Sequence, residues 1–444
     1  MADNHGAARD SIVSSYLRQA YQLAELEALW NCLTKHGTLS FSPLENGLFS
    51  AAVVNEDTVY TGYEAVWVRD NVYVAYAHYL DGTEAEREVA IATIKSLAQF
   101  FHQERLAFEC VISAGRSPAN QMDRPHVRFK GHTLERIAQP WNHAQNDALG
   151  YFLWFFCQLV LDDVLEPTAE DYSLLALFPL YFEAIRYWED EDSGHWEESP
   201  KVEASSIGVV VAGLIALREV LSRNRLIDYL KDRHGRIISS ELLEMLTDEG
   251  ERTLAKTLPY ESIQAGKERR YDAALLFLAY PLQVLPIEQG QRICLDIKEN
   301  LQGEYGISRY KGDSFWCRNY QDLPEDIRTD VSEKREAWMA EHDRALRSDE
   351  EAQWCIFDPI MSAFYGWQYQ QTAETVFLRQ QTDHFNRAIS QLTSGDCLMG
   401  ELKCPELYYL QSGKWVANDA TPLLWTQANL LVALKWMQRS LIER

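Results

Sequence analysis

The chain has 444 residues, of which 46% are hydrophobic, and it carries a formal net charge of -24 with a sequence pI of about 4.9. An acidic surface repels phosphate groups, so nucleic acid and anionic membranes are excluded as expected partners, and a neutral polar ligand is favoured. The eight cysteines form no CxxC pair, the N-terminus does not resemble a signal peptide, and the apolar runs are shorter than the ~18–20 residues of a membrane helix, so we expect a cytoplasmic protein.

The predicted elements are helical almost throughout. Apolar residues at three- and four-residue spacing predict a first helix within residues 1–37, and residues 49–62 favour a short hairpin. Similar spacing predicts amphipathic helices near 83–105, 171–188, 225–247, 286–300, 373–392 and 422–441. A second class of helix is apolar most of the way round and needs neighbours on every side; its members are 148–161, 204–217, 271–285 and 421–437.

The alternation of these two classes predicts an outer ring of helices around an inner ring, which is an all-α barrel. No Gly-, Ser- or Pro-rich linker divides the chain, so we expect a single domain over residues 1–444. Within it, residues 1–37 would form a first outer helix, and the charged segment 312–350 would be an insertion. A helical solenoid is disfavoured because the sequence has no self-similar period.

Polar clusters directly precede several of the predicted inner helices. In chain order they are "WVRDN" at 67–71, "WNHAQND" at 141–147, "HWEE" at 195–198, "ERRYD" at 268–272, "GISRYKGDSFW" at 306–316 and "GELKCPELYY" at 400–409. Loops that enter the inner helices at one face of a barrel would converge on one pocket. The sequence therefore predicts a single site built from these loops.

The adjacent acids Glu197 and Glu198 follow Trp196 and precede a very apolar helix. Acids at this place commonly stabilise the first turn of a helix. An indole beside a carboxyl group also lowers the local dielectric and raises the pKa, as a proton donor near neutral pH requires. His195, just before the pair, is expected to be an exposed loop histidine.

Glycoside hydrolysis needs a second carboxylate across the scissile bond. The later loop offers Glu401 and Glu406, and each is equally compatible with an ordinary solvated loop acid. In "YEAVWVRDN", Arg69 and Asp70 are able to bind vicinal hydroxyl groups, or to form a salt bridge at a helix start.

Taken together, "YEAVWVRDN", "HWEE", "SRY", "PELYY" and "TPLLWTQANLLVALKWM" resemble glycoside hydrolase family 15, the glucoamylase family, over about residues 50 to 440. "CPELYYL" and "WVRDNVYVAYAHYLDG" are also similar to the glucoamylase-like domain of the phosphorylase kinase α and β subunits. The resemblance implies an (α/α)6 barrel and inverting hydrolysis of α-glucosidic bonds from a non-reducing end, without metal or cofactor.

The resemblance also implies roles for residues of this chain. Glu197 would be the general acid, Glu198 a contact to the leaving sugar, and Glu406 the general base, with Glu401 as the alternative base. Further substrate-binding residues are expected from the same motifs: Tyr63, Trp67, Arg69, Asp70, Trp141, Asp147, Trp196, Arg309, Tyr310, Trp354 and Trp425. Arg69 and Asp70 would clamp the terminal sugar and Tyr63 would stack on it, whereas core packing is the favoured role for Trp425 and less so for Trp141.

The leading hypothesis is an exo-acting hydrolase whose partner is an α-glucan, an oligosaccharide or a small glucoside. One alternative is a non-hydrolytic sugar-binding or regulatory protein of glycogen metabolism, and another is a hydrolase for trehalose or a glucosyl-polyol. Residues 110–140 and 312–350 would set the pocket depth that distinguishes these substrates. Linkage preference and oligomeric state do not follow from the residues.

Overall fold

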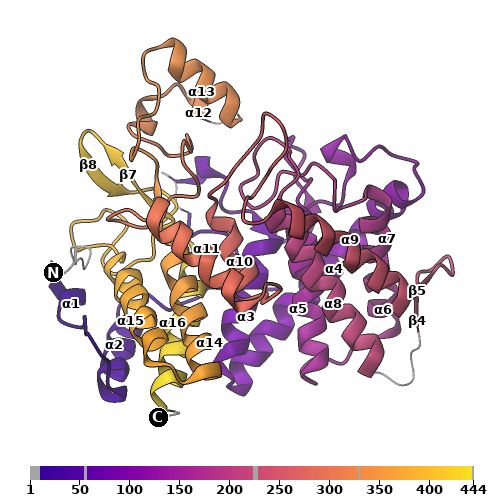
Figure 1. Cartoon of the computed structure of the whole chain (residues 1–444), viewed down its shortest axis with the longest axis horizontal. Coiled ribbons are helices and arrows are strands. Elements are labelled where there is room, and N and C mark those ends of the chain that lie inside the picture. The colour runs from indigo at the N-terminus through magenta and orange to yellow at the C-terminus, as the bar shows by residue number, and fades with distance from the viewer. Residues whose placement is uncertain (1–10, 55–57, 224–228, 329–330, 443–444) are drawn as a thin grey trace.

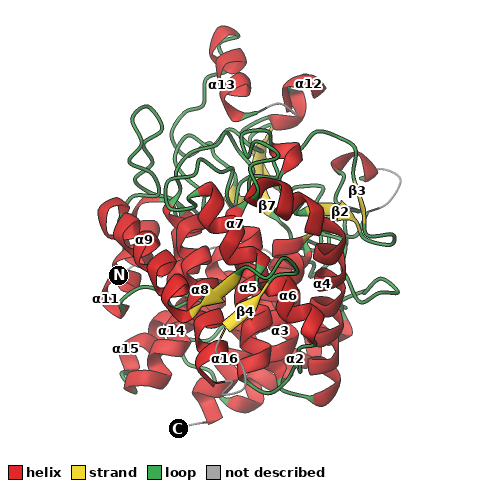
Figure 2. Cartoon of the chain, turned by 90° about the vertical axis from the view of Figure 1, so that its right-hand side faces the viewer, coloured by secondary structure: helices red, strands yellow, loops and turns green. Residues whose placement is uncertain are grey.

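The computed structural model describes residues 11–54, 58–223, 229–328 and 331–442. The long helices stand side by side, and most of the loops gather at one end of the molecule, the upper end in Figures 1 and 2. Two short helices of the charged segment, α12 (Glu325–Arg328) and α13 (Ser332–Glu341), rise above these loops.

Six inner helices close a ring within the described part of the chain, each packed against the next and the last against the first. In ring order they are α3 (Val68–Asp81), α5 (Asn146–Leu161), α8 (Ala204–Arg223), α10 (Leu276–Ala279), α14 (Phe357–Thr372) and α16 (Leu424–Ile442). A ring needs helices that are apolar on nearly every side, because each has two ring neighbours and an outer cover. Most residues of α5 and α8 are accordingly buried.

The outer layer packs on this ring from outside and is formed by helices with one apolar face. Its members are α2 (Leu23–Lys35), α4 (Glu84–Ile112), α6 (Ala169–Leu175), α7 (Leu177–Ile185), α9 (Ser240–Thr257), α11 (Ile287–Asn300) and α15 (Thr375–Ser390). The predicted all-α (α/α)6 barrel is therefore confirmed.

The first outer helix differs from the prediction, since α1 (Ser11–Ser14) and α2 are separate helices. Between them the Tyr21 hydroxyl donates to Asn386 on α15 at 2.7 Å, which draws the chain out of a helical path. Gln22 then begins α2, and the Glu25 carboxylate accepts from the Gln22 backbone N–H at 2.9 Å.

Three other element predictions are wrong in the described residues. Within 271–285 only the 3-10 turn Ala273–Leu275 and the short helix α10 are helical. At 49–62 there is no ladder of paired strands; instead Ala51 and Ala52 donate to the carbonyls of Ala65 and Tyr63 across a loop. Residues 225–228 of the helix predicted over 225–247 lie outside the described residues, and within 229–247 the chain forms a hairpin of β4 (Tyr229–Lys231) and β5 (Ile237–Ser239) before α9 starts. The turn residue Asp232 accepts from two backbone N–H groups, an arrangement that competes with a helix.

The apolar helix α8 is long and apolar enough to cross a membrane by length and composition, contrary to the sequence estimate. In the fold, 83% of its most apolar window is buried against other helices. It is therefore placed as an inner helix of the ring.

Two small antiparallel sheets lie among the loops at the upper end (Figure 2). In the first, β1 (Val66–Trp67), just before α3, pairs with β2 (Arg128–Lys130), and β2 pairs with β3 (Glu135–Arg136). In the second, β6 (Gln353–Trp354), just before α14, pairs with β7 (Leu407–Gln411), which pairs with β8 (Lys414–Ala417). The sheets thus fix the backbone directly before two inner helices.

Candidate active site

Glu197 lies in the loop before α8, and its backbone is in the left-handed region with φ +58°. A residue with a Cβ atom rarely adopts this conformation, and such residues concentrate at functional sites. Asn142 stabilises the turn by donating its side-chain amide to the Glu197 carbonyl at 2.7 Å. Since α8 begins only at Ala204, the paired acids do not cap its first turn.

Two donors from the start of α3 hold the Glu197 carboxylate. Trp67 Nε1 donates to Glu197 Oε1 at 2.8 Å, and Arg69 Nη2 donates to the same oxygen at 3.3 Å. Burial raises the pKa of Glu197, while the positive charges of Arg69 and Arg128 oppose that rise. The carboxyl group is thus in an environment that favours a retained proton.

The sequence argument assigned the wrong indole to Glu197. Trp196 turns its Nε1 toward Asp272 and donates to it at 2.9 Å, and its ring packs 5.9 Å from that of Trp354. The indole that contacts Glu197 belongs to Trp67. The left-handed turn at Glu197 explains the difference, because it directs adjacent side chains to different neighbours.

Glu406 immediately precedes β7 and is buried. Its Oε1 accepts from the Tyr63 hydroxyl at 2.8 Å, and its Oε2 accepts from the Asn418 side-chain amide. Burial raises the pKa of Glu406 to about 7; the two hydrogen bonds oppose the rise and the negative charge of Glu197 adds to it. The two carboxylates therefore lie close enough to interact electrostatically.

Neighbouring aromatic side chains link the two acids. The rings of Tyr63, which donates to Glu406, and Trp67, which donates to Glu197, meet edge to face with centroids 5.6 Å apart. Glu401 lies elsewhere: its side chain is 38% exposed and is 3.7 Å from His36. This geometry favours Glu406 over Glu401 as the second carboxylate of the site.

Arg69 and Asp70 do not form the salt bridge that was the alternative to sugar binding. Arg69 Nη1 instead donates to Asp147 Oδ2 on α5 at 2.6 Å. Asp147 is fully buried. Burial and the nearby charges of Glu197 and Glu406 raise the pKa of Asp70 to about 7, although the charge of Arg69 opposes the rise. Asp70 is thus an acid beside both carboxylates with no ion-pair partner within 4.0 Å among the described residues.

Glu198 points into a different cluster from Glu197. Its Oε1 accepts from Arg309 at 3.1 Å and from the Tyr310 hydroxyl, and its Oε2 accepts from Arg269 at 3.0 Å. Burial alone would raise the pKa of Glu198, but the charges of Arg269, Arg309 and Lys201 lower it to about 2. Glu198 is therefore an ionised anchor whose oxygens already accept from the protein.

The predicted tryptophans surround the site at different depths. Trp141 meets Trp67 edge to face at 6.1 Å, whereas Trp425 on α16 stacks on Phe277 at 5.5 Å beneath Arg69. Arg309 lies 5.0 Å above the Trp354 ring. The indole N–H groups of Trp141, Trp354 and Trp425 are buried without a hydrogen-bond partner among the described residues, so they are donors with unused capacity.

His195 is buried and not exposed as the sequence suggested. Its ring nitrogens are hydrogen-bonded to the Tyr151 hydroxyl at 3.0 Å and to Ser205 Oγ at 3.2 Å. Burial lowers the pKa of His195 to about 4, and the charge of Asp147 only partly opposes this. A neutral imidazole therefore supports the floor of the site.

Sequence reasoning missed three residues that contact the predicted ones. Arg128 pairs with Trp67 across β1 and β2, Asn418 holds Glu406, and Arg269 holds Glu198. Arg269 belongs to the "ERRYD" cluster, so its polar setting before an inner helix was a usable signal. Arg128 and Asn418 lie in loops without a recognisable motif.

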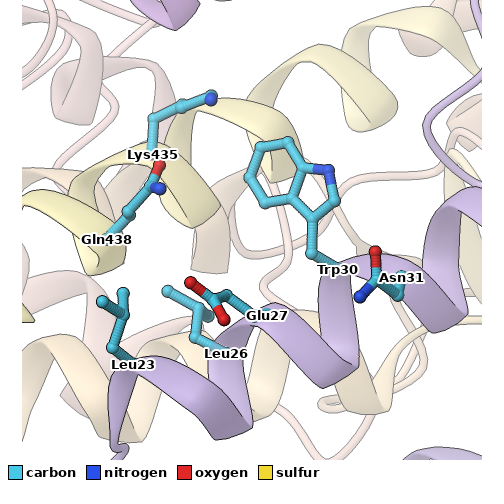
Figure 3. A pocket seen from close by; sticks show the side chains of 7 residues that line it. All are labelled: Leu23, Leu26, Glu27, Trp30, Asn31, Lys435 and Gln438. Atoms are coloured by element: carbon cyan, nitrogen blue, oxygen red, sulfur yellow. The ribbon is translucent and has the colours of Figure 1, made fainter.

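Other parts of the described chain lack the features of such a site. Among the described residues, no group of three or more His, Cys, Asp or Glu side chains is placed to hold a metal ion. A separate hollow of about 320 Å³ lies between α2 and α16 (Figure 3). It is lined by Leu23, Leu26, Glu27, Trp30, Asn31, Lys435 and Gln438. With Glu27 as its one carboxylate, it lacks the second acid that glycoside hydrolysis needs.

Comparisons with known proteins identify the family of this chain and several relatives. The sequence profile of Glycosyl hydrolases family 15 matches residues 26–338. A Caenorhabditis elegans protein named "Probable phosphorylase b kinase regulatory subunit alpha" is 25% identical over 405 residues, which cover 82% of this chain and 30% of that protein. The chain thus spans less than a third of the length of that relative.

Similar folds are known from solved structures. A glycosidase variant in complex with glucose is 17% identical, with a TM-score of 0.61 and coverage of 94% of this chain and 96% of that one. The glucoamylase from Saccharomycopsis fibuligera is 12% identical, with a TM-score of 0.59 and coverage of 96% and 97%. At such low identity these likenesses establish the fold alone.

Proposed function

The chain belongs to glycosyl hydrolase family 15, and from this premise we propose that it hydrolyses α-glucosidic bonds and releases glucose from the non-reducing end of soluble α-glucans or oligosaccharides. One observation carries the proposal: two carboxylates far apart in sequence, the partly buried Glu197 and the buried Glu406, are held by the touching side chains Trp67 and Tyr63. Two carboxyl groups that flank the scissile bond are the chemical requirement of this reaction.

In the proposed mechanism, Glu197 gives its proton to the glycosidic oxygen as the bond from that oxygen to the anomeric carbon breaks. A water molecule attacks the same carbon from the opposite face, and Glu406 takes its proton. Glu197 ends ionised and Glu406 ends protonated, so exchange with solvent restores both. Inversion requires the two carboxyl groups to stand about 6.5–9.5 Å apart, to leave room for the water.

The other residues would bind and orient the sugar. Asp70, which has no ion-pair partner among the residues that the structure describes, is suited to accept from sugar hydroxyl groups, while Arg69 is held rigid by Asp147. The flat faces of the tryptophans around the site suit pyranose rings. We assign Glu198 to holding Arg309 and Arg269 in place.

The test uses maltooligosaccharides and follows the anomer of the released glucose by NMR. We expect β-glucose from the unmodified chain, and a loss of kcat of about 10²–10⁴-fold in Glu197→Gln and in Glu406→Gln. Glu401→Gln is the matched control, because it makes the same chemical change in a partly exposed acid paired with His36. Equal activity in all four folded proteins would contradict the proposed roles.

A second candidate function follows from the Caenorhabditis elegans relative, whose name describes a kinase regulatory subunit. On this reading the barrel binds a sugar without turnover. Saturable binding of maltooligosaccharide by calorimetry, together with no glucose release over hours, would favour it over hydrolysis.

A further inference from the structure

Arg128 is a buried cation near Glu197, and it has no carboxylate within 4.0 Å among the described residues. The other arginines of the site are neutralised at close range. Arg69 lies 2.6 Å from Asp147, Arg309 lies 2.6 Å from Asp313, and Arg269 lies 3.0 Å from Glu198. An unpaired buried charge is expensive, so a structural role alone does not explain its retention.

Aromatic faces hold the Arg128 guanidinium instead of a carboxylate. Its central carbon lies 4.0 Å from the Trp141 ring centroid and 4.9 Å from that of Trp67. Arg128 stands opposite Trp67 in the register of β1 and β2, which fixes this stacking. Within the part of the chain that the structure describes, its side chain makes one hydrogen bond, a long contact of 3.5 Å from Nη2 to the Gly62 carbonyl, and Nε and Nη1 have no partner there.

Trp67 connects this cation to the acid, because its ring carries Arg128 and its Nε1 donates to Glu197 at 2.8 Å. A cation over an indole face is attracted by the ring quadrupole and draws electron density away from the N–H group. The bond from Trp67 to the ionised form of Glu197 is strengthened in this way. The guanidinium also acts directly on Glu197 through a poorly solvated interior.

We propose that Arg128 is a positioning residue that acts through Trp67 and through space on Glu197, and that it lowers the pH at which this acid gives up its proton. The proposal rests on the function proposed above. Arg128 does not contact the sugar in this role, since Nε and Nη1 are buried from solvent.

Charged and titratable groups face Glu197 from every element packed around it. They are Arg69 and Asp70 on α3, Arg128 on β2, Asp147 on α5, Tyr63 before β1 and Glu406 before β7. The negative groups favour a protonated Glu197, and Asp147 neutralises Arg69. Arg128 is therefore the positive charge in this set that no carboxylate within 4.0 Å offsets.

The experiment compares Arg128→Gln, which removes the charge, with Arg128→Lys, which keeps it. The alkaline limb of the pH profile of kcat/KM reports the pKa of the general acid. Losing a nearby positive charge makes ionisation of Glu197 harder, so Arg128→Gln should move this limb upward by about one pH unit. Arg128→Lys should keep the limb near its original position.

Arg124→Gln is the control for a merely structural effect, because Arg124 is a buried arginine of the same connection that pairs with Asp190 at 2.6 Å. It should lower stability or overall activity without moving the limb. An alkaline limb that stays in place in Arg128→Gln overturns the proposal.

A second readout does not depend on catalysis. Ionisation of Glu197 changes the environment of Trp67, so tryptophan fluorescence can follow it. The fluorescence of the unmodified chain and of Arg128→Gln is titrated with pH, each with and without the additional change Glu197→Gln. The difference between the two curves of each pair is due to Glu197. The midpoint should be higher in Arg128→Gln than in the unmodified chain. If the chain proves inert toward glucosides, the proposed function fails, and the fluorescence titration alone then tests the role of Arg128. A titration midpoint that is the same in Arg128→Gln and in the unmodified chain overturns that role.

Discussion

Tyr63 donates its hydroxyl to Glu406 across 2.8 Å, and this bond stabilises the ionised base. Burial raises the pKa of Glu406 to about 7, and Tyr63 together with Asn418 keeps it from rising further. The proposed base is thus half protonated near neutral pH. Below about pH 7 the proposed hydrolysis should therefore decline as pH falls.

Replacing Tyr63 with phenylalanine keeps the ring and removes the donor. Without this bond the pKa of Glu406 should rise, so the acid limb of the kcat/KM profile should move upward by about one pH unit. Tyr60→Phe is the control, since the hydroxyl of this exposed tyrosine donates to Asp419 and not to Glu406. An acid limb that moves equally in both variants, or in neither, would be incompatible with this role of Tyr63.

The motifs indicated the two acids but not their immediate contacts. Glu197 and Glu406 are held by the neighbouring rings of Trp67 and Tyr63, because each acid lies in a loop that leads into an inner helix. Trp196 was assigned to Glu197 only because it is adjacent in sequence, and the left-handed turn sends it to Asp272 instead. Contacts such as Arg128 on Trp67 depend on strand register, which no local pattern reveals.

The helices α5 and α8 approach each other closely through Gly150. A Cβ atom at this position would lie 2.9 Å from the backbone of Val209 and Val210 on α8, where no side chain can turn aside. Gly213 on α8 faces Gly150 in return, since a Cβ atom added at Gly213 would lie 3.0 Å from the Gly150 carbonyl oxygen. The two inner helices are therefore held at a separation that only glycine allows.

Gly150→Ala should lower the free energy of unfolding by about 2 kcal/mol, because overpacking outweighs the gain in helix propensity. Chemical denaturation followed by circular dichroism measures this change. Gly115→Ala is the matched control: its added methyl group would lie 3.5 Å from the nearest atom, an ordinary van der Waals contact. Equal stability of Gly150→Ala and the unmodified chain would mean that α5 and α8 separate without cost.

Helix type was predictable from the sequence, whereas helix ends were less so. An inner helix is buried on all sides and is apolar all round, whereas an outer helix is buried on one side and is amphipathic. The alternation of the two layers was therefore predictable from the pattern of apolar residues in the sequence. The break before α2 depends on Tyr21 reaching Asn386 on α15, a contact 365 residues away in the chain. The hairpin before α9 depends on the side chain of Asp232 capturing the backbone, which apolar spacing does not report.

The (α/α)6 barrel gathers its functional loops at one end while the chain as a whole carries a charge of -24. These charges act on any approaching solute over about 10 Å at moderate salt. Within the site, the arginines are mostly neutralised by carboxylates, so they do not reverse this field. A neutral sugar should enter without electrostatic cost, whereas an anionic sugar should be repelled.

This expectation is tested by ionic strength. For maltotriose, kcat/KM should change by less than about twofold between ~0.02 and ~0.5 M NaCl, because a neutral substrate gains nothing from screening. An oligosaccharide of the same length with a terminal uronate should be a poorer substrate at low salt and should improve several-fold as salt is added. Circular dichroism at each salt concentration controls for changes in the fold. If the uronate substrate is instead the better one at low salt, a local positive potential governs the site in spite of the net charge, and the neutral substrate class proposed here is wrong.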